Sequence, residues 1–232
     1  MKIPPSPLSS GLRDLAALAL PQRCPGCGLD VEAERFLCEG CRARIPRFES
    51  VLCVRCLAAG REPVGCLAHR GSSAHARWIY DERAALVIHA LKYGERTALA
   101  PWLGHEMAQA LAPGYRPDLV VDVPLHRTRR RERGYNQAAL LADALAVAIA
   151  APRLVDALER VRPTRAQARL EPGARRRNMA GAFRVANPEA LAGRSVLIVD
   201  DVLTTGATLE SALDALAGAG ADARGMVLAW AA

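Results

Sequence analysis

A chain of 232 residues with 51% hydrophobic content can form one globular domain and a small additional module. Its formal net charge of +7, carried mostly by arginine, indicates phosphate-bearing partners. No apolar run reaches the roughly 18 residues of a membrane-spanning helix, and the proline-rich first residues are unlike an export signal. We therefore expect a cytoplasmic protein with no membrane span.

A short amphipathic helix at residues 12–20 precedes four pairs of metal-ligand residues, each with two residues between its members. The pairs are Cys24 and Cys27, Cys38 and Cys41, Cys53 and Cys56, and Cys66 and His69. Such spacing in a chain of helices and strands favours structural zinc in a reducing compartment over disulfide bonds. The pairs can combine in chain order, which we favour, or cross-braced, with the first pair joining the third. We interpret residues 1–72 as a double zinc-knuckle module whose folding energy comes largely from the metal.

Residues 73–232 are predicted to form a single α/β domain. Its first expected elements are a strand at 76–81, helices at 83–92 and 97–112, and a buried strand at 118–123. An arginine-rich segment, residues 124–137, follows and is expected to be a loop. Ligands bind at the carboxyl ends of strands in such sheets, so Leu125, His126 and Arg127 are candidate ligand-binding residues. The arginines after them are equally compatible with a pyrophosphate clamp and with a solvated basic surface.

The elements that follow are a helix containing Leu140 and Ile149, strand-like residues at 153–157, a strand at 183–185 and a last strand at 225–230. A second arginine-rich segment runs from Arg160 to Asn178 and is punctuated by proline. It is compatible either with a loop that closes over a ligand or with a basic linker.

Residues 195–209 carry the pattern around which the domain is organised. Val196 to Val199 form an unbroken apolar run, which is typical of a strand buried on both faces. Asp200 and Asp201 stand at its carboxyl end, before a turn of small residues and an amphipathic helix that ends near Gly218. The turn consists of Thr204, Thr205, Gly206, Ala207 and Thr208.

This turn is a predicted phosphate site. The first N–H groups of the helix have no partner within the helix, and together with the helix dipole they favour an anion. Gly206 permits close approach of the backbone, and the threonine hydroxyls add donors. Adjacent carboxylates would repel a phosphate, but they can accept hydrogen bonds from a vicinal diol. Asp200 and Asp201 therefore indicate a ribose whose 5-phosphate lies in the turn.

The sequence from Val199 to Thr208 resembles the phosphoribosyl pyrophosphate (PRPP) loop of type I phosphoribosyltransferases. This resemblance implies a parallel sheet flanked by helices, with the paired acids on the ribose hydroxyls and residues 204–208 on the 5-phosphate. It also implies that Mg²⁺ accompanies PRPP and that the segment after Arg160 closes over it. Arg160 and Arg177 match the family pattern there and are the expected catalytic residues, beside the two aspartates.

Further features resemble the ComF family of competence-associated, GntX-related proteins. They are Val123-Pro-Leu-His126, Arg133-Gly-Tyr-Asn-Gln137, Leu91-Lys-Tyr-Gly94 and the cysteine-rich front. Two positions depart from the family pattern: His69 replaces a fourth cysteine, and Asp122 stands where a proline is more common. The resemblance implies a phosphoribosyltransferase-like domain with a small N-terminal zinc-binding module and a link to natural transformation.

Two functions are compatible with these residues. In the first, the protein binds Mg-PRPP. It either acts as a PRPP-binding protein or transfers phosphoribosyl to an unidentified acceptor, while arginines stabilise the departing pyrophosphate. In the second, it is a non-catalytic accessory of DNA uptake or processing that contacts single-stranded DNA or competence proteins through its basic loops and zinc module. Aromatic residues make up only 4% of the chain, so stacking on bases is not indicated.

Overall fold

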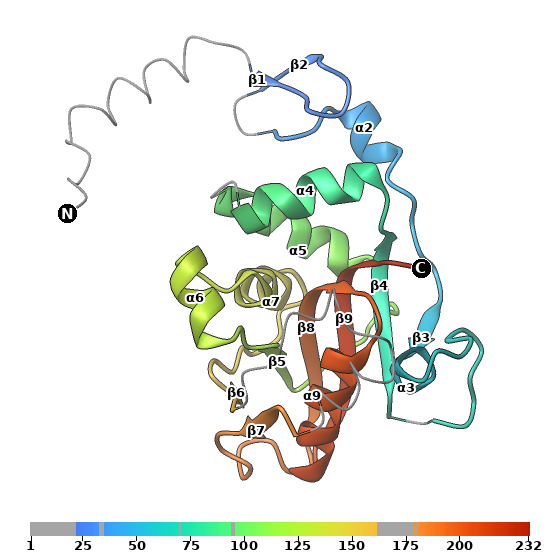
Figure 1. Cartoon of the computed structure of the whole chain (residues 1–232), viewed down its shortest axis with the longest axis vertical. Helices are drawn as coiled ribbons and strands as arrows, with labels where there is room; N and C mark the ends of the chain where they lie inside the picture. Colours follow the sequence, from blue (N-terminus) through green and yellow to red (C-terminus); the bar gives the residue numbers. More distant parts are fainter. Residues whose placement is uncertain (1–21, 33–34, 70, 94–95, 162–178, 180) are drawn as a thin grey trace, which may run out of the picture.

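A central sheet organises the part of the chain that the computed structural model describes, residues 22–32, 35–69, 71–93, 96–161, 179 and 181–232. Within these residues the sheet has five strands. In spatial order they are β3 (Val51–Cys53), β4 (Ser73–Ile79), β9 (Asp222–Trp230), β8 (Ser195–Leu203) and β5 (Leu119–Asp122). The pairs other than β3 with β4 are parallel, which confirms the predicted α/β fold with a parallel sheet (Figure 1). The antiparallel edge strand β3 was not part of that prediction.

Strand β8 lies between two hydrophobic cores. Val196 and Ile198 belong to the core on one face of the sheet, and Leu197 and Val199 belong to the core on the other. All four side chains are fully buried. Because successive side chains of a strand point to opposite faces, an unbroken apolar run is what a strand covered on both faces requires.

Helices cover both faces of the sheet (Figure 1). The core that contains Leu197 and Val199 is closed by α4 (Glu82–Tyr93), α5 (Ala100–Ala108) and α7 (Gln137–Ala148). Helices α5 and α7 pack so tightly that a Cβ atom added to Gly104 would lie 2.5 Å from the Ala144 carbonyl carbon. The core that contains Val196 and Ile198 is closed by α9 (Ala207–Gly218), against which the short helix α3 (Val54–Ala58) packs.

The first cysteine pairs lie in a small module at the N-terminal end of the described chain. Its elements are β1 (Gln22–Arg23), β2 (Asp30–Val31) and α2 (Glu39–Ala43). Cys24 and Cys41 are buried in the core that contains α4 and α5, and the Arg42 guanidinium lies 4.2 Å from the centre of the Trp102 ring. Strand β3, although N-terminal to residue 72, is an edge strand of the central sheet. The division at residue 72 stays a prediction.

The arginine-rich segment after β5 is a helix and not the expected loop. Helix α6 spans Arg127–Arg133. The His126 side chain caps it by accepting a hydrogen bond from the Thr128 N–H, and Gly134 ends it with a left-handed φ of 80°. Arginine has a high helix propensity, so two good caps are enough to make this segment helical.

Other elements also differ from those expected; for example, β4 and β9 each begin three residues earlier. Residues 153–157 do not form a strand, because Asp156 has a φ of 54°; the strand β6 spans Leu158–Arg160 and pairs with β7 (Phe183–Val185). The helix expected at 97–112 is a 3₁₀ turn, η1 (Thr97–Leu99), followed by α5. In the described part of the chain, no helix combines the length and apolarity needed to cross a membrane.

Candidate functional site

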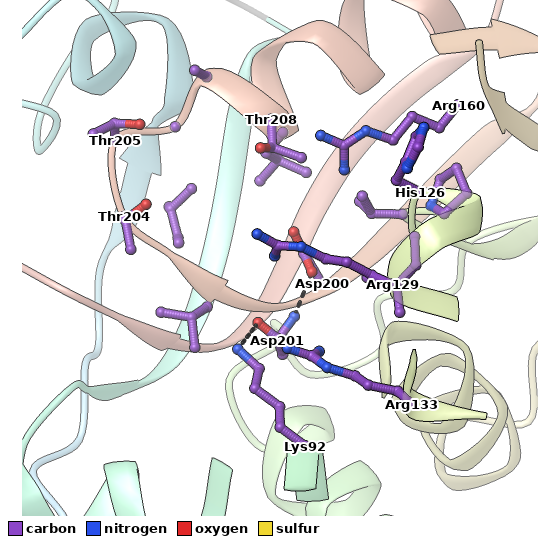
Figure 2. Close-up of a pocket in the computed structure, with 18 of the residues that line it drawn as sticks. Lys92, His126, Arg129, Arg133, Arg160, Asp200, Asp201, Thr204, Thr205 and Thr208 are labelled. Carbon is purple, nitrogen blue, oxygen red and sulfur yellow. Dashed lines mark hydrogen bonds and ion pairs between the residues drawn. The ribbon is translucent and has the colours of Figure 1, made fainter. Parts of the chain in front are cut away.

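A cavity of about 630 Å³ opens at the carboxyl ends of β8 and β5 (Figure 2). Its walls come from the end of β8, the turn before α9, the connection from β5 into α6, the last turn of α4 and the end of β6. Asp200, Asp201 and all five residues of the turn from Thr204 to Thr208 line it, as do Leu125 and His126. The structure therefore brings together two segments that the sequence marks as ligand-binding.

The turn presents the N-terminus of a well-formed helix to the cavity. Gly206 is the residue that precedes α9, and its φ of 78° lies in the left-handed region that favours glycine. Among the described residues no side chain caps this end of the helix, so the start of α9 faces the turn without a side-chain cap from them. The arrangement is suited to an anion.

The two aspartates lie next to each other but differ in their partners. Asp201 accepts a hydrogen bond from Lys92 Nζ at 2.9 Å, and its own backbone N–H donates to Asp200 Oδ1 at 2.8 Å (Figure 2). Burial raises the pKa of Asp200 to about 7, and the neighbouring Asp201 charge adds to this. The Asp201 N–H, Lys92 and Arg160 act in the opposite direction. The pair therefore combines an ion-paired carboxylate with a carboxyl group that titrates near neutral pH.

Cations surround these acids. Arg129 and Arg133, one turn apart on α6, extend toward the aspartates, while Arg160 approaches from the end of β6 (Figure 2). Burial is the main cause that lowers the pKa of Arg160, with repulsion by Arg129 second. Because an arginine pKa starts above 12, the group stays charged. The cavity thus has several fixed positive charges around a carboxylate pair.

The cavity includes residues that the sequence interpretation did not assign to the site. In the sequence, Lys92 stands out only as part of the Leu91-Lys-Tyr-Gly94 motif. Arg129 is equally compatible with a solvated surface and with a pyrophosphate-binding role. A helical reading of the segment would have identified Arg129 and Arg133 together, because positions four apart share a helix face. The backbone of Arg127 starts α6, but its side chain is not among those described. Arg177 and the rest of the second arginine-rich segment after Val161 also lie outside the described residues.

The segment from Arg133 to Gln137 holds one wall of the cavity in place. Asn136 caps α7 by accepting from the Ala138 N–H at 3.2 Å. Its amide group donates to Asp122 Oδ2 at 2.7 Å and to the Val123 carbonyl at 3.1 Å. The Tyr135 hydroxyl donates to the Leu91 carbonyl, next to Lys92. These contacts fix the connection from β5 to α6, so the segment has a positioning role.

The cysteine and histidine ligands form two groups in chain order. One contains Cys24, Cys27, Cys38 and Cys41, and the other contains Cys53, Cys56, Cys66 and His69. Within each group all four ligand atoms lie within 4.8 Å of one another. The pairing in chain order is therefore the one observed, and the cross-braced alternative is excluded.

The spacing of the ligand atoms fits a zinc ion. The sulfurs of Cys27 and Cys38 are 3.5 Å apart, and so are those of Cys56 and Cys66. His69 Nδ1 lies 3.4 Å from each of the other three ligand atoms of its group. A tetrahedron with zinc about 2.3 Å from each sulfur has edges of about 3.8 Å. Both groups are thus possible zinc sites, and the histidine completes the second as well as a cysteine would.

Comparison with known proteins agrees with this geometry. The sequence matches the phosphoribosyl transferase domain family over residues 133–231, which include β8, the turn and α9. It is 30% identical over 208 residues to the DNA utilization protein YhgH of Salmonella typhimurium, covering 86% of this chain and 81% of the relative. Competence protein F of Haemophilus influenzae is 30% identical over 187 residues, covering 80% of this chain and 74% of the relative. The chain therefore belongs to the ComF family, which includes competence protein F and YhgH, and carries a phosphoribosyl transferase domain.

Proposed function

We propose that this protein binds PRPP with Mg²⁺ at the cavity and has the site of a phosphoribosyltransferase. The observation that carries the proposal is the presence, in one cavity, of a helix N-terminus, a pair of acids and several cations. Each part suits a different portion of PRPP. The acceptor that would receive the phosphoribosyl group is unidentified.

The 5-phosphate is assigned to the turn from Thr204 to Thr208. The N–H groups at the start of α9 and the threonine hydroxyls can donate to its oxygens, and the helix dipole favours its charge. The ribose hydroxyls are assigned to Asp200 and Asp201. Mg²⁺ would enter with PRPP, whose hard oxygen ligands suit this ion, and would offset the negative charge of the pyrophosphate.

The pyrophosphate is assigned to the cationic side of the cavity. Arg129, Arg133 and Arg160 line that side, and Arg177 is predicted to join them. Guanidinium groups can bind phosphate oxygens bidentately. In a transfer reaction they would stabilise the negative charge that builds up on the leaving pyrophosphate as C1 becomes oxocarbenium-like. No residue is required to form a covalent bond, so catalysis would depend on positioning.

The neutral-range pKa of Asp200 fits this role. A protonated Asp200 reduces the repulsion between the acids and the incoming phosphates. A cation that arrives with the ligand would favour the ionised form, which accepts hydrogen bonds from ribose hydroxyls. We expect ligand binding to release a proton at neutral pH, which calorimetry in two buffers of different ionisation enthalpy measures.

The decisive experiment is a titration of the protein with PRPP and Mg²⁺ by calorimetry. The wild-type protein is compared with the double variant Asp200→Asn and Asp201→Asn at matched thermal stability. Asp222→Asn, an exposed acid at the opposite end of the sheet, serves as the control. We expect micromolar binding by the wild type and the control, and none by the double variant. Absence of PRPP binding by the wild type would overturn the proposal.

The relatives' names suggest the setting of this activity. One is named for DNA utilization and another for competence. We propose that this chain also acts in DNA uptake or processing, with zinc in both ligand groups as a structural ion. Loss of transformation or of growth on DNA in a strain carrying the double aspartate variant is the expected result.

A second candidate function is binding of single-stranded DNA without catalysis. The observation in its favour is the exposed face of α6, where Arg130 and Arg131 are solvent-accessible beside the cavity. Tyr93 is 65% exposed nearby and stacks under the guanidinium of Arg133 at 4.8 Å. This function predicts binding that weakens steeply with salt and that Arg130→Gln with Arg131→Gln reduces, whereas PRPP has no effect on it.

A further inference from the structure

Helix α3 lies between the second ligand group and the phosphate turn. It starts directly after Cys53, whose sulfur accepts a hydrogen bond from the Cys56 N–H at 3.4 Å. Two of the four ligands in the group therefore belong to the first turn of this helix. A five-residue helix is too short to be stable by itself, so its position depends on what it is attached to.

Other residues of α3 touch the turn. A Cβ atom added to Gly206 would lie 3.0 Å from the Val54 carbonyl oxygen, 3.3 Å from the Ala58 nitrogen and 3.5 Å from the Leu57 Cβ. The glycine at the start of α9 thus packs directly on the backbone of α3. Any shift of α3 toward or away from Gly206 changes the space available to the turn.

Arg55 connects the same two helices by charge. It stands between Cys53 and Cys56, and its Nη2 donates to Asp214 Oδ1 at 2.7 Å. Its Nε lies 3.8 Å from Glu210 Oε1, on a side chain that is buried in the first turn of α9. Neither Arg55 nor these two acids lines the cavity, so they act on the turn and not on a ligand in it.

We propose that the metal in the second ligand group supports the phosphate turn, so that metal occupancy and PRPP binding are thermodynamically linked. The identity of the ligand rests on the proposed function, but the mechanical link does not. With the metal bound, Cys53 and Cys56 are fixed to Cys66 and His69, and α3 forms a rigid wall for Gly206. Without it, the wall loosens and the turn loses its preorganised shape. Linkage is reciprocal, so PRPP binding also raises the affinity of the second ligand group for its metal.

The first ligand group provides an internal contrast. Cys24 and Cys41 are buried against α4 and α5, on the other face of the sheet from α9. Among the described residues its contacts are with that core, and none of its ligands lies beside Gly206. Loss of its metal should therefore leave the turn unchanged.

The test compares Cys66→Ser with Cys27→Ser in the full-length protein. Zinc per chain is measured by mass spectrometry, amide hydrogen exchange of residues 203–213 is followed, and PRPP with Mg²⁺ is titrated by calorimetry. We expect each variant to lose one zinc ion. Only Cys66→Ser should speed exchange in this segment, and it should weaken PRPP binding at least tenfold. Equal effects of the two variants, no effect of Cys66→Ser, or a wild type without zinc in the second group would overturn the proposal.

A second pair of variants keeps every metal ligand and carries the test if Cys66→Ser does not fold. Arg55→Gln removes the charge link to α9, and Arg61→Gln removes an exposed charge from the same ligand group's loop. We expect both to retain the zinc content of the wild type, with faster exchange at 203–213 and weaker PRPP binding for Arg55→Gln only. If Cys66→Ser and Arg55→Gln exchange faster but the wild type does not bind PRPP, the proposed function is overturned and the link between α3 and the turn is supported. If the wild type binds PRPP but exchange is unchanged in Cys66→Ser and Arg55→Gln, the proposed function stands and this inference is overturned.

Discussion

Lys92 Nζ and Asp201 Oδ1 lie 2.9 Å apart, although 109 positions separate the two residues in the chain. Both side chains are mostly buried, with 19% and 13% of their surfaces exposed. The contact joins the last turn of α4 to the end of β8, so two separate segments of the chain set the charge of the site. One of the two adjacent acids is therefore paired with a cation.

We predict that Lys92→Gln destabilises the fold by about 1–3 kcal/mol, because Asp201 is left as a mostly buried charge without this cation. The pKa of Asp200 should rise further, since Lys92 is one of the charges that lower it. Urea unfolding at pH 7 measures the first effect. Lys92→Arg, which keeps the charge, is the control and should restore most of the loss. Equal stability of Lys92→Gln and the wild type would show that the ion pair contributes nothing.

The raised pKa of Asp200 predicts that stability falls as pH rises. Between the ordinary aspartate pKa near 4 and the folded value of about 7, the folded state binds a proton that the unfolded chain has lost. The free energy of unfolding therefore decreases with pH in this window, and below pH 4 the penalty is absent. Asp200→Asn removes the titrating group.

We accordingly expect Asp200→Asn to be more stable than the wild type by about 3–4 kcal/mol at pH 8 and nearly equal to it at pH 4. The asparagine oxygen can still accept the hydrogen bond from the Asp201 N–H. Thermal unfolding at a series of pH values measures the difference. A constant difference across this range would mean that Asp200 does not titrate there. The same variant should bind PRPP more weakly, so removal of the Asp200 charge should raise the stability of the protein and lower its affinity for PRPP.

The strand, the two acids and the turn from Thr204 to Thr208 were predictable because their signals are local. The apolar run of Val196 to Val199, the two acids and the small turn residues occur consecutively, and each has a separate physical meaning. The cysteine pairs were predictable for the same reason. Their grouping in chain order is the favoured prediction and the one observed, although spacing alone also allows cross-bracing.

The rest of the site depends on contacts that the sequence does not encode locally. Nothing near Lys92 indicates Asp201 as its partner, and the position of Gly206 against α3 is a result of packing. The arginine-rich segment has a composition common to loops and helices, and only the caps at His126 and Gly134 decide for a helix. These features could be interpreted only from the three-dimensional arrangement.

We predict that Gly206→Ala destabilises the protein by about 1–3 kcal/mol and weakens PRPP binding. Its φ of 78° is unfavourable for alanine, and the added methyl group would lie 3.0 Å from the Val54 carbonyl oxygen. Gly218→Ala on the same helix is the control, because a methyl group there meets nothing within 4 Å. It should be neutral or slightly stabilising. Similar unfolding free energies for the two variants would contradict the close packing of the turn on α3.

The last prediction concerns Asn136, which is remote from any ligand group but holds the cavity wall. Asn136→Ala removes the cap of α7 and the hydrogen bonds to Asp122 and the Val123 carbonyl. We expect a loss of about 2–3 kcal/mol in the free energy of unfolding, because a helix cap and two partly buried hydrogen bonds are lost together.

Asn187→Ala is the matched control for Asn136→Ala. Asn187 is exposed, and its side-chain oxygen accepts a hydrogen bond from the Ala190 N–H at 3.3 Å. Because the Asn187 side chain does not connect two segments of the chain, its removal should lower the free energy of unfolding by no more than about 1 kcal/mol. If PRPP affinity falls in Asn136→Ala under conditions where that variant is fully folded, the connection from β5 to α6 positions the cationic side of the cavity. Unchanged affinity would mean that Leu125, His126 and the α6 arginines keep their places without this anchor.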